Sequence, residues 1–224
     1  PTGRGIRRAM ASRMNAKLDY KSHQSIVRGE PGFFIHYGGS YDRWTGQGWG
    51  SQITTYSINE SGETIQTIKR KEISTRQGSN QKHHSLLKMD EDTYISVAFH
   101  EGKAQLAVLT ISKDGTTITR EEEKFLSYLN PQNSDNGLYN SLIKINSNNF
   151  AVLSRDNQAD GWIMTYSLAE DGKSVKSEWR HEFEIRELRE GVESSLFSVN
   201  GSTIGVAMSD NKGYGQIELF ELNT

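Results

Sequence analysis

The sequence predicts an all-β fold in a single domain. Two observations lead to this class: segments with alternating apolar residues recur along the chain, and short turns containing glycine separate them. A third observation, the regular return of one pattern four times, predicts how the strands are arranged. With 224 residues the chain is long enough to bury a sizeable core.

One recurring pattern has the form of a β-hairpin. Residues 53–70, 106–123 and 163–180 each begin with an alternating apolar strand, pass through a turn ending in Gly, and continue as a more polar strand. The glycine is expected because such turns need a positive φ, which is costly for other residues. Each segment therefore predicts two antiparallel strands.

A second pattern lies between these hairpins. Residues 84–99, 140–155 and 194–209 share a serine, an apolar strand, a polar turn and another apolar strand, and residues 24–39 form a weaker copy. These strands are more apolar than those of the hairpins, so we expect them to be more deeply buried. The two patterns together define a unit of four antiparallel strands, in which the second pattern supplies the first two.

The four units are regularly spaced. Their first serines, Ser25, Ser85, Ser141 and Ser195, are 60, 56 and 54 residues apart. Periods of this size with four short strands are typical of the blades of a β-propeller, which bury their faces against one another around an axis. Independent sandwiches would not repeat one pattern four times. We expect a four-bladed β-propeller with blades at about 23–73, 84–126, 140–184 and 194–224.

The fourth unit ends before its outer strand, and the start of the chain has the sequence to supply it. Residues 2–14 align with residues 114–126, so that Gly3 matches Gly115 and Ile6 matches Ile118. We therefore expect residues near 4–13, within an outer strand at about 3–14, to pair with residues near 215–222 and close the ring, which removes open edges. Two alternatives remain: the chain is part of a longer array, or several chains share one larger ring.

At the level of architecture the chain resembles four-bladed β-propeller proteins over nearly its whole length. It has no cysteine, which disfavours the hemopexin-like family, where a disulfide is common. It also has neither the GH…WD pair of WD40 blades nor the double glycine of kelch blades. The resemblance therefore implies a fold and no functional subfamily.

Composition excludes several classes of partner. The formal net charge is −2, and basic and acidic residues nearly cancel, so we expect no nucleic-acid partner. No apolar run has the length of a membrane span. The lack of cysteine excludes disulfides, thiol nucleophiles and Cys-ligated metals. We expect no cofactor, apart from an ion or water in the axial channel, and we favour a secreted or surface-exposed location over a cytoplasmic one.

The longer loops predict the face on which a ligand would bind. They connect the second strand of each unit to the third and one unit to the next, and they share one end of the sheets, here called the long-loop face. Residues 38–51 combine five glycines with aromatic side chains, which suits stacking on a sugar or anchoring a protein. Equally, Trp44 and Trp49 could fold back over the first blade. The candidate ligand-binding residues are Tyr41, Asp42, Arg43, Trp44, Trp49, His84, His100, Arg155, Asp156 and Asp210.

Two further sets of polar residues have a structural and a functional interpretation. Histidines 83, 84 and 100, with Asp156 and Asp210, could form a polar ring near the axis, but no spacing among them is diagnostic of a metal site, which favours solvated loop residues. The four repeated serines could line the channel mouth. Their recurrence in every unit favours a structural role, in which they cap the preceding turn by bonding backbone amides.

The sequence contains no recognisable catalytic constellation. We therefore expect a non-catalytic binding module that recognises a carbohydrate, as a lectin does, or a protein through the long-loop face. One alternative is a glycoside hydrolase, with acids such as Asp42, Glu101, Asp156 and Asp210 gathered at the channel mouth. Another is a structural subunit of a larger surface or viral assembly, which would show a large apolar patch.

Overall fold

The structure is a computed structural model that describes residues 24–30, 32–41, 48–59, 64–73, 82–100, 103–126, 138–155, 161–183, 195–209 and 215–222. Fifteen strands and no helix occur in these ranges, so the predicted all-β class is confirmed. The described part of the chain contains no helix that is long and apolar enough to cross a membrane.

The strands form four antiparallel sheets that follow one another along the chain. Sheet 1 consists of β1 (Ser25–Arg28), β2 (Phe33–Tyr41), β3 (Gly48–Ile58) and β4 (Ile65–Glu72). Sheet 2 consists of β5 (Lys82–Lys88), β6 (Thr93–His100), β7 (Lys103–Ile111) and β8 (Ile118–Phe125). Sheet 3 consists of β9 (Leu138–Lys144), β10 (Asn149–Arg155), β11 (Gly161–Leu168) and β12 (Val175–Phe183). Sheet 4 consists of β13 (Ser195–Asn200), β14 (Thr203–Ser209) and β15 (Gly215–Glu221).

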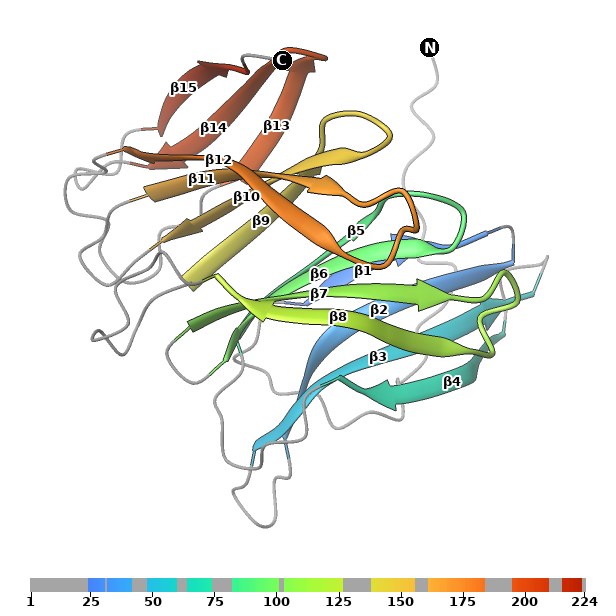
Figure 1. The fold of residues 1–224 in the computed structure, drawn as a ribbon. Coiled ribbons are helices and arrows are strands. Elements are labelled where there is room, and N and C mark those ends of the chain that lie inside the picture. The colour runs from blue at the N-terminus through green and yellow to red at the C-terminus, as the bar shows by residue number, and fades with distance from the viewer. Residues whose placement is uncertain are drawn as a thin grey trace, which may run out of the picture.

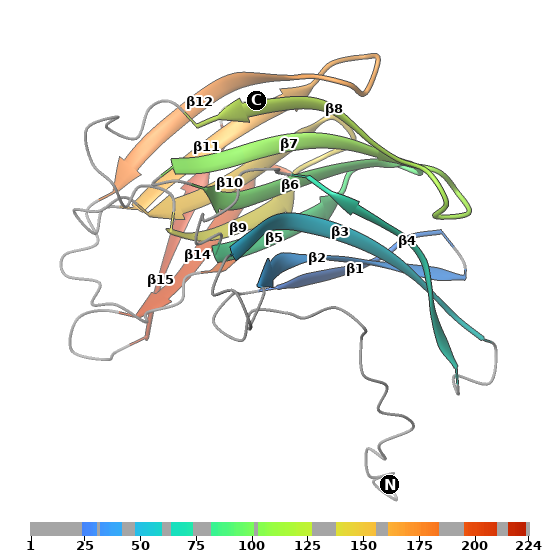
Figure 2. The same ribbon diagram turned by 90° about the horizontal axis from the view of Figure 1, so that it is seen from below.

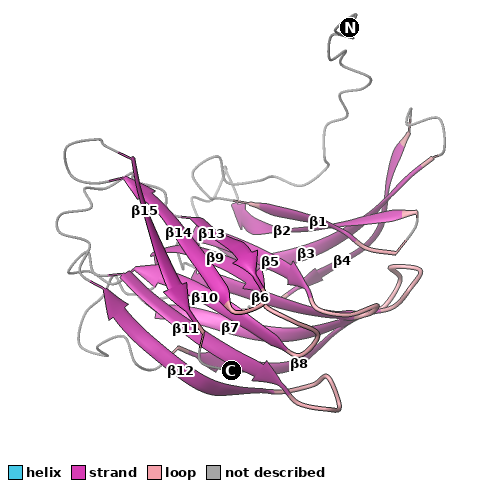
Figure 3. Cartoon of the chain, turned by 90° about the horizontal axis from the view of Figure 1, so that it is seen from above, coloured by secondary structure: helices cyan, strands magenta, loops and turns pink. Residues whose placement is uncertain are grey.

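The sheets are stacked face to face in chain order. In Figure 1 they form four successive layers, with sheet 1 and sheet 4 at opposite ends of the stack. The first strands β1, β5, β9 and β13 contact one another in that order and form the inner side of an arc. The view from below shows β4, β8 and β12 on the outer side of this arc (Figure 2). The view from above shows the successive sheets following the same curve (Figure 3). This arrangement is propeller-like.

Alternation along the strands gives each sheet two faces that pack on different neighbours. We call the face towards the preceding sheet in the chain the leading face, and the face towards the following sheet the trailing face. Ile35 and Ile53 on the trailing face of sheet 1 pack with Leu109 of sheet 2. Similar clusters join sheet 2 to sheet 3, and sheet 3 to sheet 4. The period of two therefore builds three inter-sheet cores from one repeated pattern.

The repeat extends to backbone irregularities. The pairing of the third strand with the outer strand shifts register at the same point in three sheets, directly after Thr55, Val108 and Thr165. Gly115 and Gly172, in the following turns, have φ values of 72° and 68°, as predicted for the turn glycines. Because a β-bulge adds one residue and bends its strand, its repetition gives the three outer strands the same course.

Sheet 4 has three strands among the described residues, and β15 forms its outer edge. The predicted pairing of residues near 4–13 with residues near 215–222 lies outside the described residues, since residues 1–23 are not described. Closure of the ring therefore stays a prediction.

Candidate functional site

The hairpin of β2 and β3 reaches further towards the long-loop face than its counterparts. Its pairing continues to Tyr41 and Gly48, with a register shift after Gly39. The corresponding hairpin of sheet 3 ends at Arg155, which occupies the position of Gly39. The strands thus extend two residues beyond sheet 3, and they lead into the loop with the candidate aromatic residues.

The first strand of sheet 2 contains a bulge made of two histidines. Its register with β6 shifts between Lys82 and Ser85, and His83 has a φ of 57°. Consecutive residues of a regular strand point to opposite faces, but here both His83 and His84 are buried. A positive φ outside glycine is uncommon and occurs where the surroundings stabilise it. The prediction that this pair is solvated is wrong, because both side chains are buried at the bulge.

His84 joins the two first sheets through a buried polar cluster. The Ser51 hydroxyl lies 2.8 Å from His84 Nε2, and the Tyr37 ring meets the His84 ring edge-on with centroids 4.8 Å apart. Tyr37 is hydrogen-bonded to Ser51 and Ser96, and burial raises its pKa to about 12 although these bonds oppose the rise. Tyr37 is therefore a neutral phenol at ordinary pH, and the cluster fastens β2 and β3 to sheet 2 near the long-loop face.

The contact between Ser51 and His84 has the geometry of a nucleophile and its base. A nucleophile must also meet its substrate, but Ser51 is 2% exposed. Burial therefore favours a structural function for this pair. Among the described residues, no group of three or more metal-ligating side chains could hold an ion.

The repeated serines connect neighbouring sheets. The Leu86 amide of sheet 2 donates to Ser25 Oγ of sheet 1 (3.1 Å), and the Leu196 amide of sheet 4 donates to Ser141 Oγ of sheet 3 (3.2 Å). The serines accept bonds from backbone amides, as the preferred interpretation expected. The amide belongs to the first strand of the following sheet, however, and not to the preceding turn.

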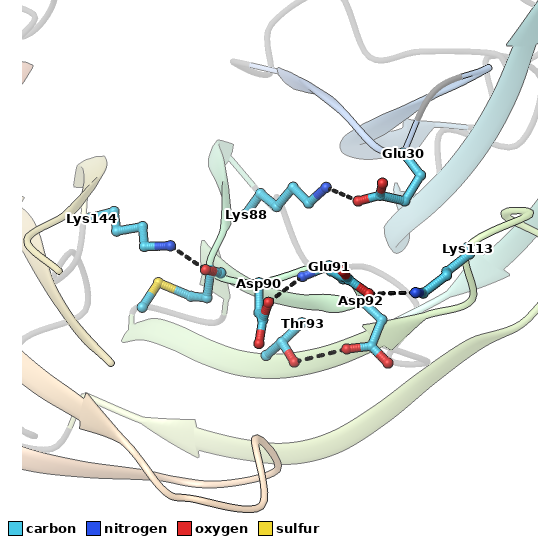
Figure 4. A network of polar contacts seen from close by, with 9 residues as sticks. Glu30, Lys88, Asp90, Glu91, Asp92, Thr93, Lys113 and Lys144 are labelled. Atoms are coloured by element: carbon cyan, nitrogen blue, oxygen red, sulfur yellow. Dashed lines mark hydrogen bonds and ion pairs between the residues drawn. The ribbon is translucent and has the colours of Figure 1, made fainter. Parts of the chain in front are cut away.

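The opposite face of the molecule, with the shorter turns, is held together by charged side chains. Lys88 of sheet 2 lies 2.5 Å from Glu30 of sheet 1, and Lys144 of sheet 3 donates to the carbonyl of Met89 in sheet 2. Figure 4 shows these contacts beside the pair of Lys113 and Glu91. This network uses its polar groups to join sheets, which makes the short-turn face a poor candidate for ligand binding.

The structure places only part of the predicted site. The backbones of Tyr41, Trp49, His100 and Arg155 lie at the long-loop ends of β2, β3, β6 and β10. His84 lies beneath them as a buried residue. The predicted residues Asp42, Arg43, Trp44, Asp156 and Asp210 lie outside the described residues.

Sequence reasoning missed Ser51 and Tyr37 as partners of His84. The sequence signal was the pair of adjacent histidines at the start of a strand that otherwise alternates. Adjacent residues of a regular strand point to opposite faces, so one of two adjacent polar rings is expected on the buried side. The partner that such a ring finds on another sheet cannot be read from local sequence.

No protein-family model matches the chain, and no curated protein matches it. Among solved structures, it is similar to a triple mutant of AofleA from Arthrobotrys oligospora, with 14% identity and a TM-score of 0.57, over 94% of this chain and 57% of that one. It is also similar to a putative 6-phosphogluconolactonase from Bacteroides fragilis, with 13% identity and a TM-score of 0.53, over 89% of this chain and 55% of that one. A structure of NanB with Optactamide has 13% identity and a TM-score of 0.53, over 79% of this chain and 26% of that one.

These likenesses concern the fold. The neighbours are propeller-like proteins, which agrees with the four stacked antiparallel sheets of this chain. The chain spans little more than half the length of the first two neighbours, at 57% and 55%. Identities of 13–14% carry no activity from one protein to another.

Proposed function

We propose that this chain is a non-catalytic binding module that recognises a carbohydrate or a protein through its long-loop face. The observation that carries the proposal is the extended hairpin of β2 and β3. The backbone pairing of its two strands includes Tyr41 and Trp49 at this face. The cluster of Ser51, His84 and Tyr37 fastens the hairpin to sheet 2. A rigid hairpin reduces the entropy lost when a ligand orders its loop.

Aromatic side chains among glycines suit such recognition. The faces of aromatic rings stack on the apolar faces of sugars and also form the anchors of protein interfaces. Residues 42–47, between the two strands, include Trp44 and Gly46. We therefore assign the ligand contacts to the aromatic residues of the segment 41–49, with Trp44 and Trp49 among them.

A binding comparison tests the assignment. The chain is applied to a glycan array, and protein partners are captured by crosslinking in a panel of protein extracts. The affinity of each ligand found is then measured for the unmodified chain and for Trp44→Ala and Trp49→Ala. We expect each variant to weaken binding at least about tenfold, as aromatic anchors do. Lys173→Ala, in an exposed turn of sheet 3 on the opposite face, is the control and leaves binding unchanged. Binding that ignores both hairpin tryptophans would contradict the assignment.

A hydrolase is the second candidate, and the contact between Ser51 and His84 at 2.8 Å is the observation in its favour. Its test is a screen with chromogenic glycosides and esters, followed by Ser51→Ala. Turnover that disappears in Ser51→Ala would replace the binding function by an enzymatic one. We expect no turnover, because a serine with 2% exposure is closed to substrate.

A further inference from the structure

The exposed large apolar side chains of the described residues lie where the described part of the chain includes no neighbouring sheet or strand. Two of them are on the leading face of sheet 1 and three on the trailing face of sheet 4, which are the two ends of the arc. The sixth lies on sheet 3 beside the outer edge of sheet 4. They are Ile26 and Ile65, then Val199, Ile217 and Leu219, and finally Trp179.

The same positions are buried at the inner junctions. Ile217 is 65% exposed, whereas Leu106 and Ile163 at the equivalent position of sheets 2 and 3 are fully buried. At the other end Ile26 is 63% exposed, whereas Leu86 of sheet 2 is 5% exposed. The end faces thus keep the apolar residues of an inter-sheet core, and contiguous exposed apolar surface marks an interface.

The polar contacts of the inner junctions also have counterparts at the ends. The amides of Leu86 and Leu196 donate to Ser25 and Ser141. By the same register, a sheet 1 packed on sheet 4 would place the amide of Ile26 against the hydroxyl of Ser195, whose residue is exposed. One end therefore carries the donor and the other the acceptor of the repeated contact.

The trailing face of sheet 3 borders a cavity near the end of β15. This cavity of about 590 Å³ is lined by Asn149, Thr165 and Glu178, among others. The equivalent residues of sheet 1, at the same register positions, are Phe33, Thr55 and Ile68, and they surround Gly115 in the turn of sheet 2. The cavity is thus the place that the last turn of a complete fourth sheet would occupy.

We propose that the trailing face of sheet 4 packs against the leading face of sheet 1 of a second copy, so that two chains form one ring of eight sheets. Within one chain the two faces lie at opposite ends of the stack (Figure 1). A two-fold axis then makes both junctions identical and leaves no end open. The resulting ring extends the proposed binding function, because it displays two long-loop faces together.

Cysteine crosslinking of the full chain tests the proposal, since the protein has no cysteine of its own. Ile26→Cys and Ser195→Cys chains are prepared separately, mixed and treated with a short bis-maleimide. We expect a crosslinked two-chain product from the mixture, and a mass of two chains for the unmodified protein by light scattering. Lys173→Cys, exposed on a turn of sheet 3, replaces Ile26→Cys in the matched control and yields no such product with Ser195→Cys.

Other results overturn the proposal. A single chain that carries both Ile26→Cys and Ser195→Cys is treated in the same way. If the crosslink forms within this chain and the product has the mass of one chain, the chain closes on itself. A mass of one chain without a crosslink means that the ends stay apart, and a mass of three or more chains excludes the two-chain ring. Leu219→Lys should weaken association at least tenfold, while Thr116→Lys, in an exposed turn of sheet 2, leaves the mass unchanged. Equal effects of the two substitutions would also contradict the proposed face.

Discussion

The junction of sheets 1 and 2 and the two ends of the arc are built from the same repeated positions, but only the junction has both partners. At the junction, Lys71 donates to the carbonyl of Ile118 (2.8 Å) and Thr55 donates to the carbonyl of Gly115 (2.7 Å). At the end of the arc, Leu219 takes the position of Thr55 and is exposed. A repeat therefore specifies contacts that one unit alone cannot make, and the ends reveal what each unit requires from its neighbour.

The largest difference between the two regions should appear in the apolar core. Ile53→Ala removes a fully buried side chain from this junction, and we expect it to lower the free energy of unfolding by about 2–5 kcal/mol. Ile217→Ala at the equivalent position of sheet 4 should change it by less than about 0.5 kcal/mol under conditions where chains are single. Urea titrations at low protein concentration measure both, and equal losses would show that one chain covers its own end.

The turn glycines give the next largest effect. A Cβ at Gly115 would lie 3.3 Å from atoms of Ile68, Phe33 and Thr55, and its φ of 72° is unfavourable for other residues. We expect Gly115→Ala to cost about 1–2 kcal/mol of unfolding free energy. Gly201→Ala is the control, because nothing lies within 4 Å of its Cβ. Equal shifts of the melting temperature in both variants would contradict the claim that the inter-sheet turn requires glycine at position 115.

A smaller effect is expected at the repeated serines. Ser25→Ala removes the acceptor of the Leu86 amide and should cost about 0.5–1.5 kcal/mol. Ser195→Ala, at the same position in sheet 4, should cost nothing measurable in single chains and should weaken the association of two copies. Chemical denaturation at two protein concentrations separates these effects, and a concentration-independent loss in Ser195→Ala would contradict the interpretation.

The smallest effect concerns pH and the leading face of sheet 1. His36 Nε2 donates to Gln24 Oε1 (2.8 Å), its Nδ1 has no partner among the described residues, and burial lowers its pKa from 6.5. The unfolded chain then binds the proton more readily, so the stability that His36 contributes is present above pH 6.5 and is lost as pH falls below it. We expect unfolding midpoints to drop between pH 7 and pH 5 and His36→Gln to flatten this slope. The same slope in the variant would assign the effect to other groups.

Much of the fold could be predicted from the sequence because it depends on local patterns. Alternation and turn glycines are local, so the strand order of sheets 1 to 3, the order of the three described strands of sheet 4, and the glycines at 115 and 172 were predicted correctly. The partner of each sheet is not local. The bonds from Leu86 to Ser25 and from Leu196 to Ser141 cross between sheets, and no pattern within one unit contains both partners.

The candidate site was less predictable for a related reason. Residues 38–51 were predicted as one loop, whereas residues 38–41 and 48–51 belong to the paired strands β2 and β3, so these strands are longer than the loop composition indicated. The burial of His83 and His84 depends on a bulge with a positive φ, which the surrounding packing stabilises. Such strain is a property of the assembled sheets, so sequence pattern alone favoured solvated rings.

Hydrogen exchange of the full chain tests the comparison of junction and end most directly. The amides of β15 are measured beside those of β7, its counterpart in sheet 2, at high and low protein concentration. Our account predicts protection of β15 that approaches that of β7 at high concentration and falls on dilution or in Leu219→Lys. Rapid exchange of β15 at every concentration would contradict the claim that a second copy covers this end of the arc.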